Sequence, residues 1–271
     1  MTIGFVGAGT MAGAIVRGIT TAGLVPGEDV VLHDVAAATA QRLADDVGAR
    51  VADSATALVE ECDVVVLAVK PQVLPAVLAD LTDAVVARRP LLVSIAAGIS
   101  LAAIEDLLGG ADVPVVRVMP NVNAMIGAGM AAVCGNDAAS AADVARVVEV
   151  FAAVGDAVEL AEKDFATYTA IAGSSPAFVF TFIDALARGA VRDGMPKALA
   201  TRIAAQAVLG SARMVLERAD DGVSPADLVD MVCSPGGTTI AGIVAMEEAG
   251  FSPAVVRGVR AVVDRDRELG G

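Results

Sequence analysis

The sequence predicts an α/β fold, with a doubly wound parallel sheet in the first part of the chain and an all-helical domain in the second. Through residue 162, short runs rich in Val, Ile and Leu alternate with Ala-rich stretches of helical periodicity. This alternation is typical of parallel strands joined by crossover helices that cover both faces of the sheet. After that point only helical patterns follow. We therefore predict a first domain at residues 1–162 and a second at residues 163–271.

The β-branched runs define the strands expected in the first domain. In chain order they are Ile3–Val6, Val30–His33, Val64–Val69, Leu91–Ile95 and Val115–Val118, with Ala131–Cys134 and Ala157–Leu160 as a further pair that extends the sheet. The spacing of apolar residues predicts helices between them at Met11–Ala22, Ala37–Val47, Gln72–Ala87, Leu101–Leu108 and Ala141–Ala153.

In the second domain, Pro and Gly residues mark the helix ends, because Pro is favoured in a first helical turn and Gly just past a last one. The helical faces are apolar enough to need a partner, so we expect at least an obligate homodimer. The predicted helices are Phe165–Asp193 with a polar interruption, Pro196–Ala219, Pro225–Val232, Thr239–Ala249 and Pro253–Glu268.

Composition excludes several classes of function. The 271 residues are 56% hydrophobic and carry a formal net charge of −14 without any Lys/Arg-rich run, so neither a nucleic acid nor an anionic membrane is an expected partner. The longest uncharged run, between Asp164 and Asp184, is interrupted by Gly173-Ser174-Ser175-Pro176, which favours a buried helix pair over a membrane span. A strand expected from Ile3 leaves no room for a signal peptide, so we predict a cytoplasmic protein.

Cysteine and histidine usage limits the chemistry further. The three cysteines, Cys62, Cys134 and Cys233, are far apart and lack metal-ligand spacing, so we expect reduced thiols and no metal site. The single histidine, His33, leaves little scope for catalysis by a Ser-His-Asp triad.

A glycine-rich loop follows the first strand directly, in Gly7-Ala8-Gly9-Thr10-Met11-Ala12-Gly13. Gly7 permits a tight turn, Gly9 lets the backbone approach a pyrophosphate, and the small Ala12 permits close packing of helix on strand. Phosphates would rest on the helix N-terminus, where free N–H groups favour anions. At the first strand–helix junction of a βαβ series, this pattern predicts a Rossmann-type dinucleotide site.

Acidic and basic side chains follow other strands of the predicted sheet. Asp34 follows the second strand, 22 residues after Ala12, where an acidic residue commonly binds the ribose hydroxyls and repels a 2′-phosphate; capping of the next helix is the alternative. No arginine follows until Arg42, so the sequence favours NADH. Lys70 and Ser94–Gly98 follow two further strands, and both segments should face the nicotinamide half of the cofactor.

Two polar stretches in the helical half have the composition of ligand sites. Ser234-Pro235-Gly236-Gly237-Thr238-Thr239 precedes an apolar-periodic helix and can form an anion site of backbone N–H groups and hydroxyls, although an ordinary helix cap is the alternative. Gly173-Ser174-Ser175-Pro176 interrupts a buried helix. The interruption frees backbone groups that need partners, which favours a ligand over a simple inter-helix turn.

These motifs together resemble the pyrroline-5-carboxylate reductase family over essentially the whole chain. The stretch from Val232 to Glu247, centred on Ser234-Pro235-Gly236-Gly237-Thr238-Thr239-Ile240, is similar to the signature of that family. Supporting motifs occur in the family's order, in Gly7-Ala8-Gly9-Thr10-Met11, Ala68-Val69-Lys70-Pro71-Gln72, Met119-Pro120-Asn121 and Gly173-Ser174-Ser175-Pro176-Ala177-Phe178.

The resemblance implies reduction of 1-pyrroline-5-carboxylate to L-proline with NADPH or NADH, the last step of proline biosynthesis. It also implies a helical dimerisation domain and dimers that can assemble into decamers. By position it assigns substrate binding to Ser174, Ser234, Gly236, Gly237, Thr238 and Thr239, with Thr239 as the catalytic residue that hydrogen-bonds the ring nitrogen. The implied cofactor-binding residues are Gly7, Gly9, Thr10, Met11, Asp34, Val69, Lys70, Pro71, Ala96, Ala97, Gly98 and Asn121.

The chain departs from the family pattern at several positions. Ser175 and Phe178 stand where the family usually has Gly and Tyr, and Asn121-Val122-Asn123 replaces the commoner Asn-Thr-Pro. Asp34 stands where many relatives have Ser or Asn, which sets the NADH expectation against the family's usual NADPH.

Three alternative functions remain open from the sequence. A β-hydroxyacid dehydrogenase would need a general base for its hydroxyl, in that class a lysine of the second domain, and neither Lys163 nor Lys197 is well placed. A reductase of another cyclic imine would share the same motifs. A dinucleotide-sensing module without turnover would have no need of the Ser234–Thr239 turn.

Overall fold

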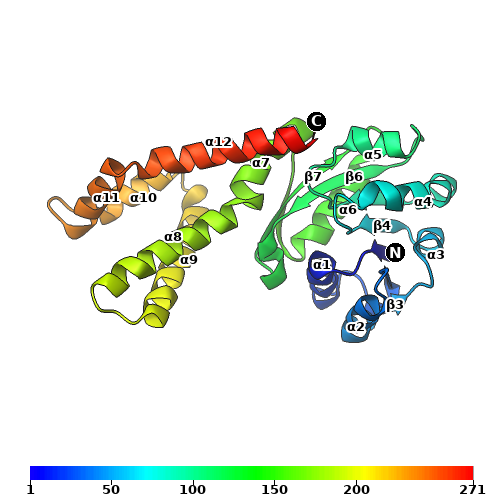
Figure 1. Ribbon diagram of the computed structural model, residues 1–271, viewed down its shortest axis with the longest axis horizontal. Coiled ribbons are helices and arrows are strands. Elements are labelled where there is room, and N and C mark those ends of the chain that lie inside the picture. Colours follow the sequence, from blue (N-terminus) through cyan, green and yellow to red (C-terminus); the bar gives the residue numbers. More distant parts are fainter. Residues whose placement is uncertain (271) are drawn as a thin grey trace. The chain divides into compact units, whose positions relative to one another are not determined.

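One sheet organises the first part of the chain in the computed structural model, which describes residues 1–270 (Figure 1). Its strands are β1 (Ile3–Val6), β2 (Val30–His33), β3 (Arg50–Val51), β4 (Val64–Leu67), β5 (Leu91–Ser94), β6 (Val115–Pro120), β7 (Gly129–Gly135) and β8 (Gly155–Glu159). They lie in the order β3-β2-β1-β4-β5-β6-β7-β8. The strands from β3 to β6 are parallel, β7 is antiparallel to β6, and β8 is parallel to β7.

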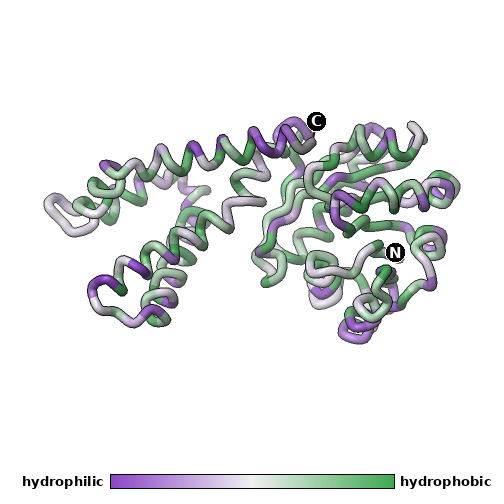
Figure 2. Tube along the Cα trace, viewed as in Figure 1, coloured by the Kyte–Doolittle hydropathy of each residue, from purple (hydrophilic) through white to green (hydrophobic). Residues whose placement is uncertain are grey.

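Helices cover both faces of this sheet, which confirms the predicted doubly wound fold (Figure 1). One face packs on α1 (Thr10–Thr21), α2 (Ala37–Val47) and α6 (Ala141–Ala152), and the other on α3 (Ala55–Glu61), α4 (Leu74–Arg88) and α5 (Leu101–Leu107). The two-residue period of a strand explains the sharing. In β1, Phe5 packs in the first core and its neighbour Val6 in the second. Apolar residues accordingly run along the strands in Figure 2.

Short connecting elements complete this part of the chain. They are η1 (Gly27–Asp29), η2 (Val122–Ile126), η3 (Glu162–Asp164), α7 (Phe165–Tyr168) and the π-helical turn η4 (Thr169–Gly173). Cys62 is fully buried after α3, and its burial raises the pKa of its thiol to about 12.

The chain divides into two compact units, residues 1–174 with 262–271, and residues 175–261. The second unit contains α8 (Ser175–Arg192), α9 (Lys197–Ala219), α10 (Pro225–Val232), α11 (Thr238–Glu248) and the first part of α12 (Phe251–Gly270), through Ala261. The division therefore falls later than the predicted boundary at residue 162, because α7 and η4 pack with the sheet. The boundary as a division of function stays a prediction.

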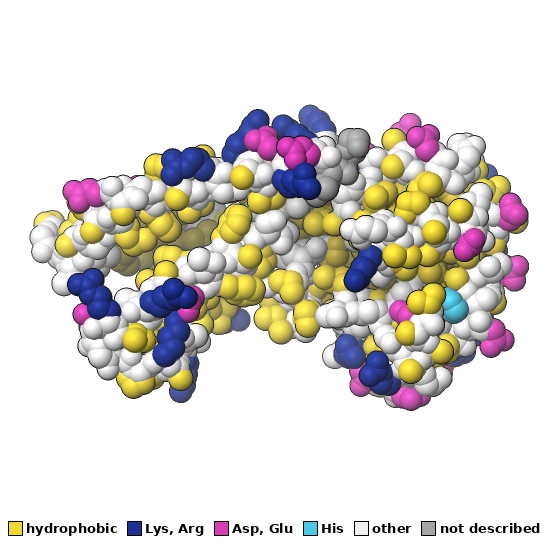
Figure 3. All heavy atoms as spheres, in the orientation of Figure 1, with side chains coloured by type: hydrophobic (Ala, Val, Ile, Leu, Met, Phe, Trp, Pro, Cys, Tyr) yellow, Lys and Arg dark blue, Asp and Glu magenta, His cyan; other side chains and the backbone are white. Residues whose placement is uncertain are grey.

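The helical unit buries few large side chains of its own. α8 and α9 pack through small residues, with Ala187, Ala200 and Ala204 buried between them. Large apolar side chains instead face outward, among them Phe180, Leu216 and Val256 at 58%, 75% and 68% exposure. Apolar side chains are also conspicuous over these helices in Figure 3.

Length and composition alone would allow part of this region to cross a membrane. One helical stretch, Glu162–Arg192, has a mean hydropathy of 1.5, with 17% of its most apolar window buried. The bent pair Thr238–Glu248 and Phe251–Glu268 also passes if its two helices are taken together. Helices of this length and composition also occur in soluble proteins, so they are weak evidence for a membrane span.

Candidate functional site

The predicted cofactor residues lie in a row at one edge of the sheet. Parallel strands end at the same edge, and the pairings Val6–His33, Val6–Leu67 and Leu67–Ser94 align the ends of neighbouring strands. Neighbouring strands are about 4.8 Å apart, so five strand ends span roughly 19 Å. In spatial order from β2 to β6, the segments that follow them are Asp34, Gly7–Met11, Val69–Pro71, Ala96–Gly98 and Asn121.

The glycine-rich loop between β1 and α1 has the backbone that the sequence predicts. Gly7 has φ +101°, its N–H donates to the carbonyl of His33 at 2.8 Å, and a Cβ there would lie 2.7 Å from the carbonyl oxygen of Ala68. Gly9 differs, because it caps α1 with an ordinary φ of −71° and a Cβ there would meet no atom within 4 Å. Packing therefore does not require glycine at position 9, whereas an approaching ligand would.

Asp34 supports this loop directly. Its Oδ2 accepts a hydrogen bond from the backbone N–H of Ala8 at 2.8 Å, and its Oδ1 accepts one from Ala36 at 2.8 Å. Each carboxylate oxygen thus already binds a backbone donor. The predicted ribose contact stays a prediction. Asp34 is not the N-cap of α2, which is Ala36, so the capping alternative does not hold in that form. The bond to Ala8 is a structural role that the sequence did not predict.

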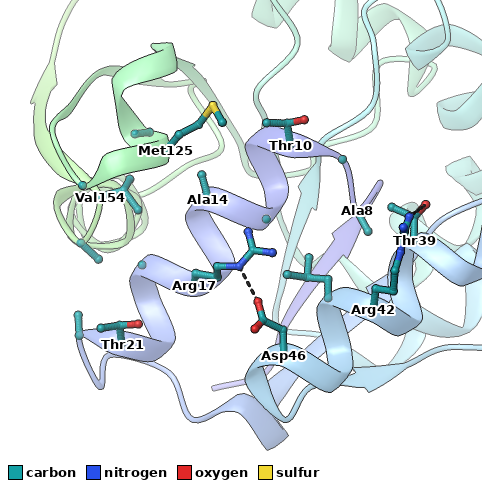
Figure 4. Close-up of a pocket in the computed structure, with 18 residues that line it drawn as sticks. Ala8, Thr10, Ala14, Arg17, Thr21, Thr39, Arg42, Asp46, Met125 and Val154 are labelled. Atoms are coloured by element: carbon teal, nitrogen blue, oxygen red, sulfur yellow. Dashed lines mark hydrogen bonds and ion pairs between the residues drawn. The ribbon is translucent and has the colours of Figure 1, made fainter.

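A cavity of about 1020 Å³ opens beside the loop, and Figure 4 shows the residues that line it. Ala8, Gly9 and Thr10 form part of its wall. Arg42 of α2 also lines it, with its Nη2 3.4 Å from Thr39 Oγ1, whereas Arg17 of α1 is paired with Asp46 at 2.6 Å. From the sequence, Arg42 is the first arginine after Asp34 and was not expected to reach the cofactor. Its position on α2, the helix that starts at this edge of the sheet, was the signal that places it beside the cavity.

The two following loops differ in what they expose. Lys70 is exposed, and its carbonyl accepts hydrogen bonds from Val73 and Leu74 at the start of α4. Ala96 is buried, and its N–H donates to Ser94 Oγ at 3.4 Å. Its neighbour Ala97 is exposed. Met11 differs from the other predicted residues, because its side chain packs against the core.

A partly buried ion pair supports the loop after β5, and it could not be read from the sequence motifs. Arg117 in β6 donates to Glu162 Oε1 at 2.8 Å, and the same oxygen accepts the backbone N–H of Leu101, the first residue of α5, at 2.7 Å. The guanidinium also lies 4.6 Å from the centre of the Phe165 ring. The available signal was a lone arginine within the apolar run Val115–Val118, since a charge in a buried strand needs a partner.

At the interrupted helix, backbone groups find hydrogen-bond partners within the protein. The polar break forms a π-helical turn in which the N–H of Ser174 donates to the carbonyl of Thr169 at 2.8 Å. The carbonyl of Ala172 accepts from Asn121 Nδ2 at 3.0 Å. The expectation that this break needs a ligand to satisfy its backbone is therefore wrong for the Ala172 carbonyl, while the role of Ser174 in substrate binding stays a prediction.

The second predicted substrate segment lies in the helical unit, as a turn between α10 and α11. Gly236 has φ +70°, and a Cβ on Gly237 would lie 2.4 Å from Ser234 Oγ, so the turn requires its paired glycines. No side chain in the described part of the chain caps α11 at Gly237. Ser234, Thr238 and Thr239 are exposed around this helix start, an arrangement that can bind a small carboxylate.

The fold and the carboxyl edge define a nucleotide-dependent oxidoreductase of the two-domain type. Residues 2–98 match the family model for NADP oxidoreductase, coenzyme F420-dependent, and residues 162–269 match that for pyrroline-5-carboxylate reductase dimerisation. The chain is 42% identical to the pyrroline-5-carboxylate reductase of Methanosarcina acetivorans, over 99% of this chain and 97% of the relative. It belongs to the pyrroline-5-carboxylate reductase family.

Solved structures support this assignment over the full length. The pyrroline-5-carboxylate reductase of Coxiella burnetii superposes with a TM-score of 0.93 at 30% identity, covering 100% of this chain and 98% of the other. The pyrroline carboxylate reductase of Plasmodium falciparum, solved with NADP bound, superposes with a TM-score of 0.88 at 28% identity and the same coverage.

The lysine that a β-hydroxyacid dehydrogenase would use has no free counterpart in the helical unit. Lys197 is held in an ion pair, with its Nζ 2.5 Å from Asp184 Oδ1. Lys163 belongs to the first unit and lines a small cavity with Arg117 and Glu162. Together with the family assignment, this removes the dehydrogenase alternative.

Proposed function

We propose that this protein reduces 1-pyrroline-5-carboxylate to L-proline with NADPH or NADH, as the last step of proline biosynthesis. The observation that carries the proposal is the full-length similarity to proteins named pyrroline-5-carboxylate reductase. The two remaining alternatives, reduction of another cyclic imine and dinucleotide sensing without turnover, account for fewer of these observations. Another cyclic imine would require a different acceptor, and a sensing module would have no use for the uncapped, hydroxyl-rich start of α11.

The residues at the carboxyl edge fit a nicotinamide dinucleotide. The space over Gly9 is open where a Cβ would fill it, and no side chain within residues 1–270 caps the N-terminus of α1. The N–H groups of Gly9, Thr10 and Met11 would hold the pyrophosphate. Lys70 and the loop Ala96–Gly98 would border the nicotinamide, and Asp34 with Arg42 would border the adenosine.

The chemistry asks little of the side chains. The cofactor, when bound, supplies a hydride to the carbon of the C=N bond. A cyclic imine is readily protonated near neutral pH, so no dedicated acid side chain is needed. The task left to the protein is to orient the ring and exclude water. In the proposed site, Ser234 and Thr238 bind the substrate carboxylate together with the N–H groups of Gly236 and Gly237. Thr239 holds the ring nitrogen through its hydroxyl.

We also propose that the protein acts in the cytoplasm as a homodimer, and that dimers assemble further, up to a decamer. The match of residues 162–269 to a dimerisation model supports association. The outward-facing apolar side chains of the helical unit support it independently, since such faces are rarely left uncovered.

The test is oxidation of NADPH and NADH, followed by absorbance, with and without 1-pyrroline-5-carboxylate. Thr239→Ala should lower kcat about tenfold or more, the loss expected for one hydrogen bond to a charged group. The dissociation constant of the cofactor should stay within about twofold of the wild-type value. Thr56→Ala, an exposed threonine on α3, serves as the control. Wild-type protein that binds the cofactor but does not oxidise it would contradict the proposed substrate.

A further inference from the structure

Asn121 is the buried residue that joins the carboxyl end of β6 to the π-helical turn η4. It is 7% exposed, and its side chain makes three hydrogen bonds within the protein. Its Oδ1 accepts the backbone N–H groups of Asn123 at 3.2 Å and Met130 at 3.1 Å. Its Nδ2 donates to the carbonyl of Ala172 at 3.0 Å, across 51 residues of sequence. The oxygen thus organises the loop after β6, and the nitrogen reaches the turn.

The acceptor of that long-range bond is a carbonyl that its own helix cannot satisfy in the usual way. In an α-helix the carbonyl of Ala172 would accept the N–H of residue 176, but residue 176 is proline and has no N–H. Ala172 is 9% exposed, so a missing partner would be costly. The amide of Asn121 supplies the donor that Pro176 removes.

The turn also packs directly on the strand end. A Cβ added to Gly173 would lie 3.2 Å from Cε of Met119, which is tighter than ordinary packing. Ser174 follows at once, and its N–H closes the turn on Thr169. The side chain of Ser174 is therefore presented from a segment that β6 holds through Asn121 and Met119. π-Helical turns inside helices are frequent at functional sites.

We infer that Asn121 is a positioning residue for substrate, which holds the π-helical turn so that Ser174 is fixed beside the nicotinamide end of the row. This rests on the proposed function. It differs from the role that the sequence resemblance implies, in which Asn121 binds the cofactor. The two roles predict losses in different binding steps, so they can be separated by experiment.

The decisive variant is Asn121→Asp, because an aspartate keeps the oxygen that accepts from Asn123 and Met130, while it removes the donor to Ala172 and adds a negative charge. We expect kcat/KM for 1-pyrroline-5-carboxylate to fall about tenfold or more, while the dissociation constant of NADPH, measured by fluorescence titration, stays within about twofold. Asn123→Asp adds the same charge two residues away and should leave both quantities near wild type. A matching loss of NADPH affinity would overturn the inference in favour of a cofactor ligand, and unchanged kinetics would remove Asn121 from both roles.

A second variant keeps the test informative if Asn121→Asp folds poorly. Pro176→Ala restores an N–H that can donate to the Ala172 carbonyl, so it should recover the thermal stability lost in Asn121→Asp. The double variant should still bind substrate weakly, because β6 no longer holds the turn. Recovery of both stability and kcat/KM would show that Asn121 acts only on folding and would overturn the inference. Wild-type protein without imine-dependent oxidation would instead refute the proposed function.

Discussion

At the scale of single residues, the carboxylate of Asp34 beside the glycine-rich loop makes hydrogen bonds that the sequence did not reveal. Asp34 has both oxygens on backbone N–H groups, so its acidity alone does not decide between NADH and NADPH. Arg42 lines the adjoining cavity with hydrogen bonds only to Thr39 and the carbonyl of Ala38 among the described residues. Neither partner is a carboxylate, and a guanidinium is well suited to bind a phosphate.

Arg42 is therefore expected to contribute to the use of NADPH. Arg42→Gln should lower kcat/KM for NADPH about fivefold, because an exposed arginine–phosphate contact is weakened by solvent, and should leave NADH within about twofold. Arg17→Gln is the matched control, since Arg17 lines the same cavity but is paired with Asp46. An equal effect of Arg42→Gln on both cofactors would place Arg42 away from the 2′-phosphate.

At the scale of elements, regular strands and helices could be predicted closely, because their signal is local. Val30–His33 and Ala37–Val47 have the predicted bounds, since β-branched runs and apolar spacing are properties of the segment itself. The two-residue strand Arg50–Val51 was missed because so short a strand carries no periodicity. The helix Ala55–Glu61 was missed because its seven residues make only about two turns, too few for a clear apolar repeat. The direction of β7 was not predictable either, since alternation specifies a strand but not its partner.

The candidate site divides in the same way. Gly7 and the turn at Gly236 could be predicted, because glycine at these two positions reports a local backbone requirement. The hydrogen bonds Asp34–Ala8, Asn121–Ala172 and Glu162–Leu101 could not, because each joins residues distant in the sequence. What the sequence lacked was the partner of each polar group, and therefore whether that group serves the fold or a ligand.

The start of α5 provides a test at this scale. Glu162→Ala removes the acceptor of the Leu101 N–H and leaves Arg117, 10% exposed at its side chain, without its ion-pair partner. We expect a loss of about 2 kcal/mol in the free energy of unfolding, measured by urea denaturation, since Glu162 is itself partly exposed. Glu61→Ala breaks the exposed pair with Arg50 and should cost about 0.5 kcal/mol or less. Equal losses in the two variants would mean that burial of Arg117 is unimportant.

The α8–α9 pair offers a prediction about pH. The hydrogen bond from Lys197 lowers the pKa of Asp184 below its ordinary value of 3.8. A carboxyl with a lowered pKa in the fold stabilises it above the ordinary value, and that contribution is lost as the pH falls through the folded pKa. Asp184→Asn should therefore lower Tm between pH 5 and 7 and approach the wild-type value towards pH 3. In a Lys197→Met background the same substitution should show a smaller pH dependence; an undiminished one would exclude Lys197 as the cause.

At the scale of the whole molecule, the composition and the fold lead to the same requirement for assembly. A chain that is 56% hydrophobic, with a net charge of −14, buries its large side chains around the sheet. The helical unit buries mainly alanines and leaves residues such as Phe180 and Leu216 more than half exposed. A monomer would therefore carry an extended apolar surface, which acidic side chains elsewhere can keep soluble but cannot cover.

The double variant Phe180→Asp with Leu216→Asp tests whether a second copy covers that surface. Burying unpaired carboxylates costs several kcal/mol, and about 4 kcal/mol weakens association roughly a thousandfold. From a chain mass of 27.1 kDa, light scattering should give about 54 kDa for a wild-type dimer or about 271 kDa for a decamer, and a smaller mass for the variant. Val86→Asp, on α4 of the first unit and 39% exposed, should leave the mass unchanged. If the double variant keeps the wild-type mass at micromolar concentration, the subunits associate through a different surface.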